Sequence, residues 1–360
     1  MPATRKLADI VPSPRVAEGW PCRRLAQGVD TWVETYSVLF DPPVREAAER
    51  SLLVARSQDA PQPFAVAPGD DMAVSPFGAR GFRLVLENPD WSLMIRSWDH
   101  DYNATVRYSS AGLWQHGLGR LRDRAQAALR ELGTWRFEDP EPTLSRVDYA
   151  IDIDAPRFDP RAELVERFVQ PRHAKAAVYV KGLRAETFTV GKLPGLQVTL
   201  YDKTREIRDA SGKEWMYDVW QLPRDHPHAV WRVEVRMGGD WLKDHNIRGI
   251  GAWLGTWRQL VSGALVDRRM TEGDDTRTRR ASVHPLWWAA IEAAGGLLED
   301  ITDRTIAEAK INHMARYDTL TGLPNRLGLL TRLRSALDER NGDRVVGAIV
   351  LDIDRFQVVN

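Results

Sequence analysis

The sequence predicts an α+β fold in which helices flank a central antiparallel β-sheet. Three segments, 144–154, 196–203 and 229–237, alternate apolar and polar residues with the period of two that is typical of a strand with one buried face. Two further segments, 44–57 and 118–132, space their apolar residues as amphipathic helices do. The chain has 360 residues, of which 43% are apolar, so it can bury a sizeable core and has the length of about two domains.

The composition limits the classes of function. Fifty Lys and Arg balance fifty Asp and Glu, so the formal net charge is zero and no global positive field attracts nucleic acid or an anionic membrane. A DNA-binding surface must therefore be a local patch. Cys22 is the only cysteine, which excludes an internal disulfide or a Cys-based zinc cluster and fits a reducing cytoplasm. The longest apolar run, at about 345–351, is far shorter than the roughly 20 residues of a membrane span, so we expect a soluble cytoplasmic protein without a membrane partner.

The chain opens with a segment that has no periodic pattern. Residues 1–27 carry four prolines and mixed charge, which predicts a flexible leader. All the helices and strands named above fall within 28–292, which we expect to be the main folded domain.

The composition changes near residue 293. The segment 293–315 starts with two alanines and two glycines and continues with helical spacing, which predicts a connecting helix. Residues 316–360 hold a helix over 326–340 and a buried strand over 345–352, so we expect an incomplete α/β fragment there.

Polar residues on the three predicted strands are candidates for a common site. Asp148 and Asp152 lie on the same side of one strand, roughly 13 Å apart along it, and a neighbouring strand would lie about 4.8 Å away. If the three strands adjoin, Tyr201 or Glu234 lies near one of these carboxylates. The shared polar face would then hold Arg146, Asp148, Asp152, Tyr201, Lys203, Arg232, Glu234 and Arg236.

These residue types suit phosphodiester chemistry. Carboxylates that converge on one point need a cation, and oxygen ligands suit Mg²⁺ or Mn²⁺. A tyrosine beside such a metal and a lysine is a credible nucleophile, because the cations lower the pKa of the phenol and stabilise charge in the transition state. The alternative interpretation is an ordinary solvated sheet face on which arginines pair with aspartates.

The motifs on these strands resemble a known family. The patterns R-x-D-x-x-x-D at 146–152, Y-D-K-x-x-E at 201–206 and W-R-x-E at 231–234 look like those of the Rep_trans replication initiation factors, which serve rolling-circle plasmids, phages and integrated elements. The segment 28–38 resembles the opening strand of that family, and 274–287 resembles a closing segment of its chromosomal members.

The resemblance implies a Rep-like fold and assigns roles by position. Tyr201 would attack DNA to form a 5′-phosphotyrosine and free a 3′-hydroxyl that primes synthesis, with Lys203 as its electrostatic partner. Glu206 also matches, although a carboxylate at the start of a helix explains it equally well. The metal ligands for Mg²⁺ or Mn²⁺ would be Asp148, Asp152 and Glu234, and the DNA contacts would be Arg146, Arg232 and Arg236. Partners implied in the same way are origin DNA in single-stranded or cruciform form, a replicative helicase and a second copy of the chain.

The sequence also contains an H-x-H pattern, which binds metal on a strand in a different class of nicking enzymes. Here it is His226-Pro227-His228, and Pro227 cannot donate to a sheet ladder. We therefore expect a loop before the strand at 229–237 and no metal role for these histidines.

The last part of the sequence resembles a signalling module. Residues 296–326 look like the end of a PAS sensor domain, its coupling helix and the start of a GGDEF diguanylate cyclase domain, and 351–360 match the first strand of that domain. By this resemblance Asp352 is a metal ligand and Asn360 contacts guanine. The sequence contains no GG[DE]EF signature. We therefore expect a truncated domain, a remnant of gene fusion or truncation without cyclase activity.

Three functions remain open on these observations. The first is a metal-dependent enzyme that nicks and joins a DNA strand at the origin of a mobile element. The second is a cyclic-di-GMP signalling protein, and the third is an origin-binding module without catalysis. The replication motifs are complete while the cyclase signature is absent, which favours the first over the second. The pair Tyr201 and Lys203 favours activity over binding alone.

Overall fold

The computed structural model describes residues 22–67, 70–136, 142–158, 160, 166–169, 176–181, 184–272 and 281–295. The chain divides into two units, 1–297 and 298–360, and every described residue belongs to the first. The rest of the expected connecting helix and the fragment at 316–360, with Asp352 and Asn360, lie outside the described residues.

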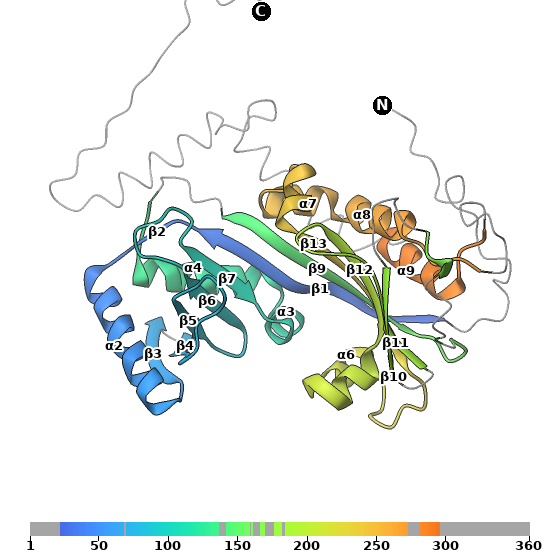
Figure 1. Ribbon diagram of the computed structural model, residues 1–360, viewed down its shortest axis with the longest axis horizontal. Helices are drawn as coiled ribbons and strands as arrows, with labels where there is room; N and C mark the ends of the chain where they lie inside the picture. The colour runs from blue at the N-terminus through green and yellow to red at the C-terminus, as the bar shows by residue number, and fades with distance from the viewer. Residues whose placement is uncertain are drawn as a thin grey trace, which may run out of the picture. The chain divides into compact units, whose positions relative to one another are not determined.

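In the described part of the chain, eleven strands form one antiparallel sheet in the order β10-β11-β12-β13-β9-β1-β7-β6-β5-β4-β3 (Figure 1). The strands are β1 (Arg23–Tyr36), β3 (Gln62–Ala67), β4 (Asp70–Val74), β5 (Leu84–Glu87), β6 (Trp91–Ile95), β7 (Ala104–Tyr108), β9 (Thr143–Asp154), β10 (Ala176–Lys181), β11 (Arg184–Gly191), β12 (Leu196–Asp202) and β13 (Val230–Gly238). Two short strands, β2 (Val38–Phe40) and β8 (Gly133–Trp135), pair separately. The predicted α+β class with a central antiparallel sheet is confirmed.

Helices cover both faces of this sheet. They are α2 (Pro42–Gln58), α3 (Ser110–His116), α4 (Leu118–Leu132), α5 (Lys203–Glu206), the π-turn η2 (Ile207–Ser211), α6 (Met216–Trp220), α7 (Gly239–Asp244), α8 (Ile250–Asp267) and α9 (Pro285–Gly295). In Figure 1, α7, α8 and α9 lie on one side of the central strands, and α3 and α6 lie on the other. No helix in the described ranges is long and apolar enough to cross a membrane.

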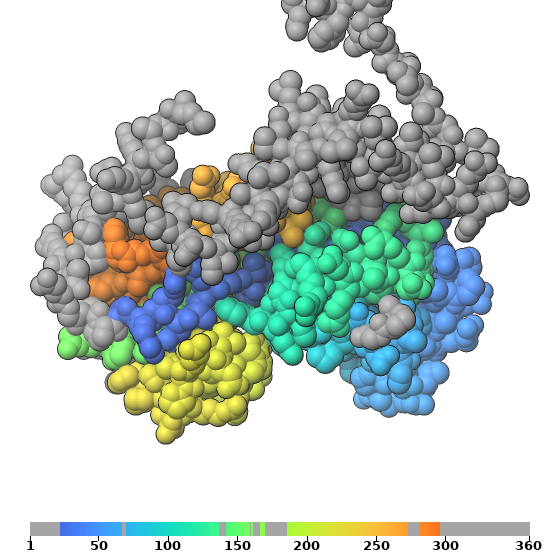
Figure 2. Space-filling model, turned by 180° about the vertical axis from the view of Figure 1, so that it is seen from behind, coloured from blue at the N-terminus to red at the C-terminus, as the bar shows by residue number. Residues whose placement is uncertain are grey.

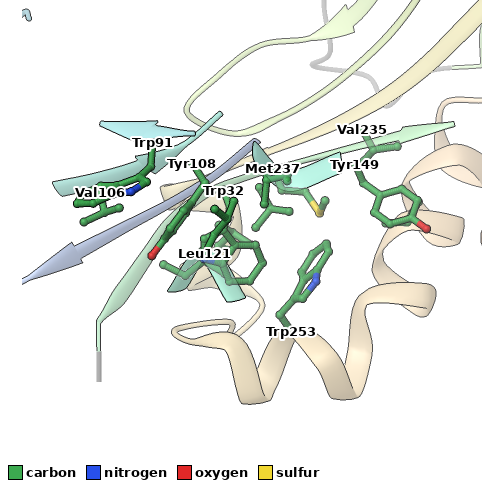
Figure 3. Packing of buried hydrophobic residues seen from close by; sticks show 14 of the residues in the cluster. Trp32, Trp91, Val106, Tyr108, Leu121, Tyr149, Val235, Met237 and Trp253 are labelled. Atoms are coloured by element: carbon green, nitrogen blue, oxygen red, sulfur yellow. The ribbon is translucent and has the colours of Figure 1, made fainter. Parts of the chain in front are cut away.

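The apolar face of the central strands forms the main core with α8. Trp32 of β1 meets Trp253 edge to face, with ring centres 5.9 Å apart (Figure 3). Tyr149 of β9 stacks on Trp257, with ring centres 4.9 Å apart. Val235 of β13 is fully buried on the same side. Large aromatic side chains bury much apolar area, so their packing fixes the register of the strands. The same register sets the positions of the polar side chains on the opposite face.

Both predicted boundaries of the main folded domain differ from those in the structure. Strand β1 starts at Arg23, which pairs with Asp154 at the end of β9, so the folded chain begins before the expected residue 28. At the other end, Ala293 and Ala294 are buried in helix α9, so the folded unit extends beyond the expected boundary at 292.

The polar face of β9 is buried, where the alternation predicts an exposed face. Asp148 is 2% exposed and Asp152 is 0% exposed. The cause is a second layer that includes α3 and α6. Seen from the other side, the α6 segment (yellow) lies next to the teal segment that contains α3 (Figure 2). The charges on this face must therefore pair with one another or line a cavity.

Candidate active site

The three motif strands are neighbours in the sheet, in the order β12-β13-β9. Their register places Tyr201 opposite Arg232 and Arg232 opposite Asp152. Two residues along β13, Glu234 lies opposite Thr199 and Ala150. Because directly paired residues share a face, Asp148, Tyr201 and Glu234 project to one side, as the spacing predicts.

A cavity of about 450 Å³ opens on this face. Its walls come from the sheet, from the β5–β6 connection, from the end of β7 with the start of α3, and from the segment before α6. The residues that line it are Asp30, Thr31, Glu87, Asn88, Trp91, Ser92, Arg107, Tyr108, Ser109, Ser110, Arg146, Asp148, Tyr201, Lys203, Glu206, Lys213, Glu234 and Arg236.

The Y-D-K-x-x-E motif forms a strand-to-helix corner. Tyr201 is near the end of β12, and the side chain of Asp202 caps helix α5 by accepting from the backbone N–H of Arg205 at 3.0 Å. Lys203 is therefore the first helical residue. Its Nζ lies 5.8 Å from the centre of the Tyr201 ring and donates to Glu206 at 2.5 Å. The match at Glu206 thus has a structural reason, since this carboxylate holds the lysine beside the tyrosine.

Burial changes the acid–base state of this pair. It raises the pKa of the Tyr201 phenol well above its usual value, and the nearby Glu234 carboxylate raises it further, while Arg232 acts in the opposite direction. Among the groups around Tyr201, burial and the carboxylates thus outweigh the lowering of its pKa by Arg232. The pKa of Lys203 is lowered, first by burial and then by Arg232.

Asp152 and Arg232 form a buried ion pair and do not line the cavity. The guanidinium of Arg232 donates to both oxygens of Asp152 at 2.6 and 2.8 Å and to Asp30 at 2.9 Å. Trp220 donates to Asp152 at 2.8 Å. Both Asp152 and Arg232 are 0% exposed. In this structure the two side chains bind each other and do not line the cavity, so they do not occupy the positions predicted for a metal ligand and a DNA contact.

Asp30 completes this buried network from strand β1. Burial by itself raises the pKa of Asp30, but Arg232 and hydrogen bonds from Trp114 and Ser110 outweigh it and lower the pKa to about 2. Asp30 is therefore ionised at neutral pH and supplies a second carboxylate that binds the buried guanidinium of Arg232.

Asp148 and Glu234 remain as candidate metal ligands. Arg146 donates to both oxygens of Asp148, at 2.9 and 2.6 Å, and Arg236 donates to Glu234 at 2.8 Å. Burial raises the pKa of Glu234, Arg236 lowers it, and the carboxylates of Asp30 and Asp148 raise it again. Across the described residues no three His, Cys, Asp or Glu side chains group as a metal site. The three-carboxylate site is therefore not formed, but two carboxylates fit Mg²⁺, which commonly takes one or two protein carboxylates and completes its shell with water and phosphate oxygens.

The motifs did not indicate two cations of this cavity. Arg107 of β7 and Lys213, which precedes α6, both line it, and neither forms an ion pair within the described ranges. Arg146 and Arg236, which the motifs did indicate, are each bound to a carboxylate. No pattern in the sequence marks Arg107, because its short strand is identified only through its pairing with β1 and β6.

The H-x-H residues lie in the loop before β13, as predicted. The Nε2 atom of His226 is 3.4 Å from Asp154 Oδ1, outside the Tyr201 cavity.

Comparison with known proteins finds two separate likenesses. Residues 315–360 match the family model of the diguanylate cyclase GGDEF domain. An uncharacterized signaling protein of Caulobacter vibrioides is 40% identical over 65 residues, which are 18% of this chain and 8% of that protein. The uncharacterized protein y4lL of Sinorhizobium fredii is 36% identical over 72 residues, 18% of this chain and 9% of that protein. The chain thus spans less than a tenth of the length of these curated relatives.

The second likeness is to a solved structure. The rolling circle replication initiator protein from Geobacillus stearothermophilus is similar with a TM-score of 0.43 and 14% sequence identity, over 75% of this chain and 97% of that chain.

Proposed function

We propose that this protein nicks and rejoins a DNA strand at a replication origin, with Tyr201 as the nucleophile. The observation that carries the proposal is that the fold brings residues of three separate motifs, at 146–152, 201–206 and 231–234, to one cavity. A tyrosine, a buried lysine and two carboxylates meet there, and these groups can serve as the nucleophile, a charge stabiliser and metal ligands.

In the proposed reaction the Tyr201 Oη atom attacks the phosphorus of one phosphodiester. The Oη–P bond forms and the bond from phosphorus to the 3′-oxygen breaks. The phenol passes its proton to water, and the leaving 3′-oxygen takes up a proton from water, so the number of protons is unchanged. The protein is then joined to the 5′-phosphate, and the free 3′-hydroxyl can prime synthesis. Lys203, held beside the ring by Glu206, stabilises the negative charge that develops on the phosphoryl group.

Asp148 and Glu234 would hold the Mg²⁺ or Mn²⁺ ion in this proposal, in place of their arginine partners. When bound, the ion would supply positive charge beside the attacked phosphate. The need for such charge follows from the pKa of Tyr201, which the Glu234 carboxylate raises. Nicking should therefore stop in EDTA and return with added Mg²⁺.

The proposed substrate is origin DNA in single-stranded or cruciform form, handled in the cytoplasm. A replicative helicase and a second copy of the chain are the partners that such an initiator would need.

The test is covalent capture of DNA. The wild-type chain is incubated with Mg²⁺ and single-stranded or supercoiled DNA from its own element, and we expect a protein–DNA adduct that survives denaturation. Tyr201→Phe should form none and bind DNA as well as the wild type, because only one hydroxyl is lost. The matched control is Tyr149→Phe, a tyrosine on the opposite face of the sheet, which should keep the adduct. An adduct in Tyr201→Phe refutes the assignment, and DNA binding without any adduct favours the origin-binding module.

The match at 315–360 supports a second candidate, a role in cyclic-di-GMP signalling. In that case Asp352 and Asn360 would contact metal and guanine. Incubation of the purified chain with GTP and Mg²⁺ tests it. We expect no cyclic-di-GMP, because this sequence contains no GG[DE]EF motif.

A further inference from the structure

A second cavity lies beside the Tyr201 cavity along strands β1 and β7, and helix α7 forms part of its wall. Side chains two residues apart on a strand share a face. On β1, Thr31 lines the first cavity and Thr35 the second, and on β7, Arg107 lines the first and Thr105 the second. The two cavities therefore follow one another along these strands, with centres on the order of 13 Å apart by the Thr31-to-Thr35 spacing.

The second cavity encloses about 620 Å³ and is rich in positive charge. Arg96, Lys243 and Arg248 line it with exposed side chains, and none of the three forms an ion pair within the described ranges. Arg96 lies over the ring of Phe82, at 5.5 Å from its centre. The carboxylate among the described lining residues is Asp101, which lies 3.9 Å from Arg136. The complete described lining is Thr35, Arg96, His100, Asp101, Tyr102, Thr105, Thr143, Leu144, Ser145, Gly239, Lys243, Ile247 and Arg248.

Arg107 lies between the two cavities. The register pairs Arg146 with Val33 and Val33 with Arg107, so Arg107 is two strands from Arg146, about 10 Å across the sheet. Arg146 is neutralised by Asp148, but Arg107 is exposed and has no carboxylate partner in the described part of the chain. Three exposed cations that form no ion pair within the described ranges, Arg107 of the first cavity and Lys243 and Arg248 of the second, are thus distributed over two neighbouring cavities, and we call this set the positive path.

We propose that this path binds the single DNA strand whose cleaved phosphate lies at Tyr201, with Arg107, Lys243 and Arg248 contacting successive phosphates. The inference rests on the proposed function and extends it. Cations along a groove with an aromatic side chain are the usual way to hold single-stranded nucleic acid. Tyr102, which is 50% exposed, lines the second cavity, and its ring suits stacking against a base.

The experiment measures binding of single-stranded DNA in the Tyr201→Phe background, so that no strand is cut. Two oligonucleotides from the cleaved sequence are compared: a short one that fills only the first cavity and a long one that reaches the second. The test variant is Lys243→Ala with Arg248→Ala. The matched control is Arg56→Ala with Arg80→Ala, which removes the same charge from exposed positions outside both cavities.

We expect the test variant to bind the long oligonucleotide several-fold more weakly and the short one normally. Two lost phosphate contacts should also reduce the slope of log affinity against log salt by about 1.4 for the long oligonucleotide, with no change in the control. An unchanged slope, an equal loss for both oligonucleotides, or no binding by the background protein overturns the inference. The proposed function is tested separately by the wild-type adduct. If the wild type forms the adduct but the slope is unchanged, the proposed DNA path is refuted and the nicking function stands. If no adduct forms but the slope changes as expected, the nicking function is refuted and the DNA path stands.

Discussion

At the residue scale, the environment of Tyr201 sets how a nicking reaction must respond to pH. The reactive form of a tyrosine nucleophile is the phenolate, and burial together with Glu234 raises the pKa of this phenol well above its usual value. Below that pKa, the phenolate fraction grows roughly tenfold for each pH unit. We therefore expect the rate of adduct formation at saturating Mg²⁺ to rise from pH 6 to about pH 9 without a plateau, measured by quenched time courses. A plateau near neutrality would show that another group controls the step.

Arg232 gives a prediction about stability. Its side chain is 0% exposed and donates hydrogen bonds to both Asp30 and Asp152. Arg232→Ala leaves two buried carboxylates without their cation, which should lower the free energy of unfolding by about 3–5 kcal/mol, as measured by urea denaturation. Arg107→Ala removes an exposed arginine and serves as the control, with an expected change within about 0.5 kcal/mol. Equal stability of Arg232→Ala and the wild type would contradict the structural role.

The sequence predicts the position of a site residue only where that position depends on neighbours in the same strand or motif. The period of two places Asp148, Tyr201 and Glu234 on one face, and the structure agrees. The role of Arg232 depends in part on its hydrogen bond to Asp30, which is 202 residues away in the chain. The local pattern contains no information about that distant partner, so a buried structural arginine and an exposed DNA-binding arginine look the same in sequence.

At the element scale, helix α9 begins with a pH-sensitive contact. The Nδ1 atom of His284 accepts a hydrogen bond from the backbone N–H of Leu286 at 3.2 Å, which requires a neutral ring. Burial, followed by the charge of Arg167, lowers the pKa of His284 to about 4. Helix α9 packs its Trp287 against α8, where the indole donates to the carbonyl of Leu265.

The pH dependence of stability follows from this histidine. The unfolded chain takes up the proton near pH 6.5 and the folded protein only near pH 4, so the unfolded state binds more protons between these values. The contribution of His284 is complete above about pH 6.5 and is lost as the pH falls toward 4, by about 3 kcal/mol at most. Urea denaturation at pH 7 and pH 4.5 should show this loss in the wild type and a smaller one in His284→Gln. His100→Gln, an exposed histidine, should behave as the wild type does.

Element boundaries were predictable where the pattern is long and its ends are marked. Helix α4 has the predicted bounds, 118–132, because Gly117 and Gly133 flank a clear amphipathic repeat. The strands from β3 to β7 have no more than six residues each, too few for a period to identify their ends. The burial of the polar face was also unpredictable, because α3 and α6 cover it from segments remote in sequence.

At the scale of the whole molecule, zero net charge coexists with a positively charged path because neutralisation is local. Arg146, Arg232 and Arg236 each have a carboxylate partner, whereas Arg107, Lys243 and Arg248 have none in the described part of the chain. A net charge counted over the sequence includes paired and unpaired cations alike and cannot distinguish them. Only the fold separates cations that stabilise the sheet from cations that remain available to a ligand.

The division of the chain at 297 yields a final prediction. Helix α9 ends at Gly295, and its buried residues Leu286, Trp287 and Ile291 complete the core of the first unit. Removing residues 298–360 takes away no described core residue. A chain of residues 1–297 should therefore melt within about 2 °C of the corresponding transition of the full chain, and it should form the Tyr201 adduct at an unchanged rate.

A slightly shorter truncation is the matched control for this experiment. A chain of residues 1–292 also loses Ala293 and Ala294, which are 5% and 2% exposed, together with the last turn of α9. Each buried alanine contributes apolar area, and the shortened helix loses backbone hydrogen bonds, so this variant should melt several degrees lower. Calorimetry of the three chains separates the outcomes. Loss of the adduct in the 1–297 chain, with its melting temperature unchanged, would show that residues 298–360 take part in the reaction and that the two units do not act independently.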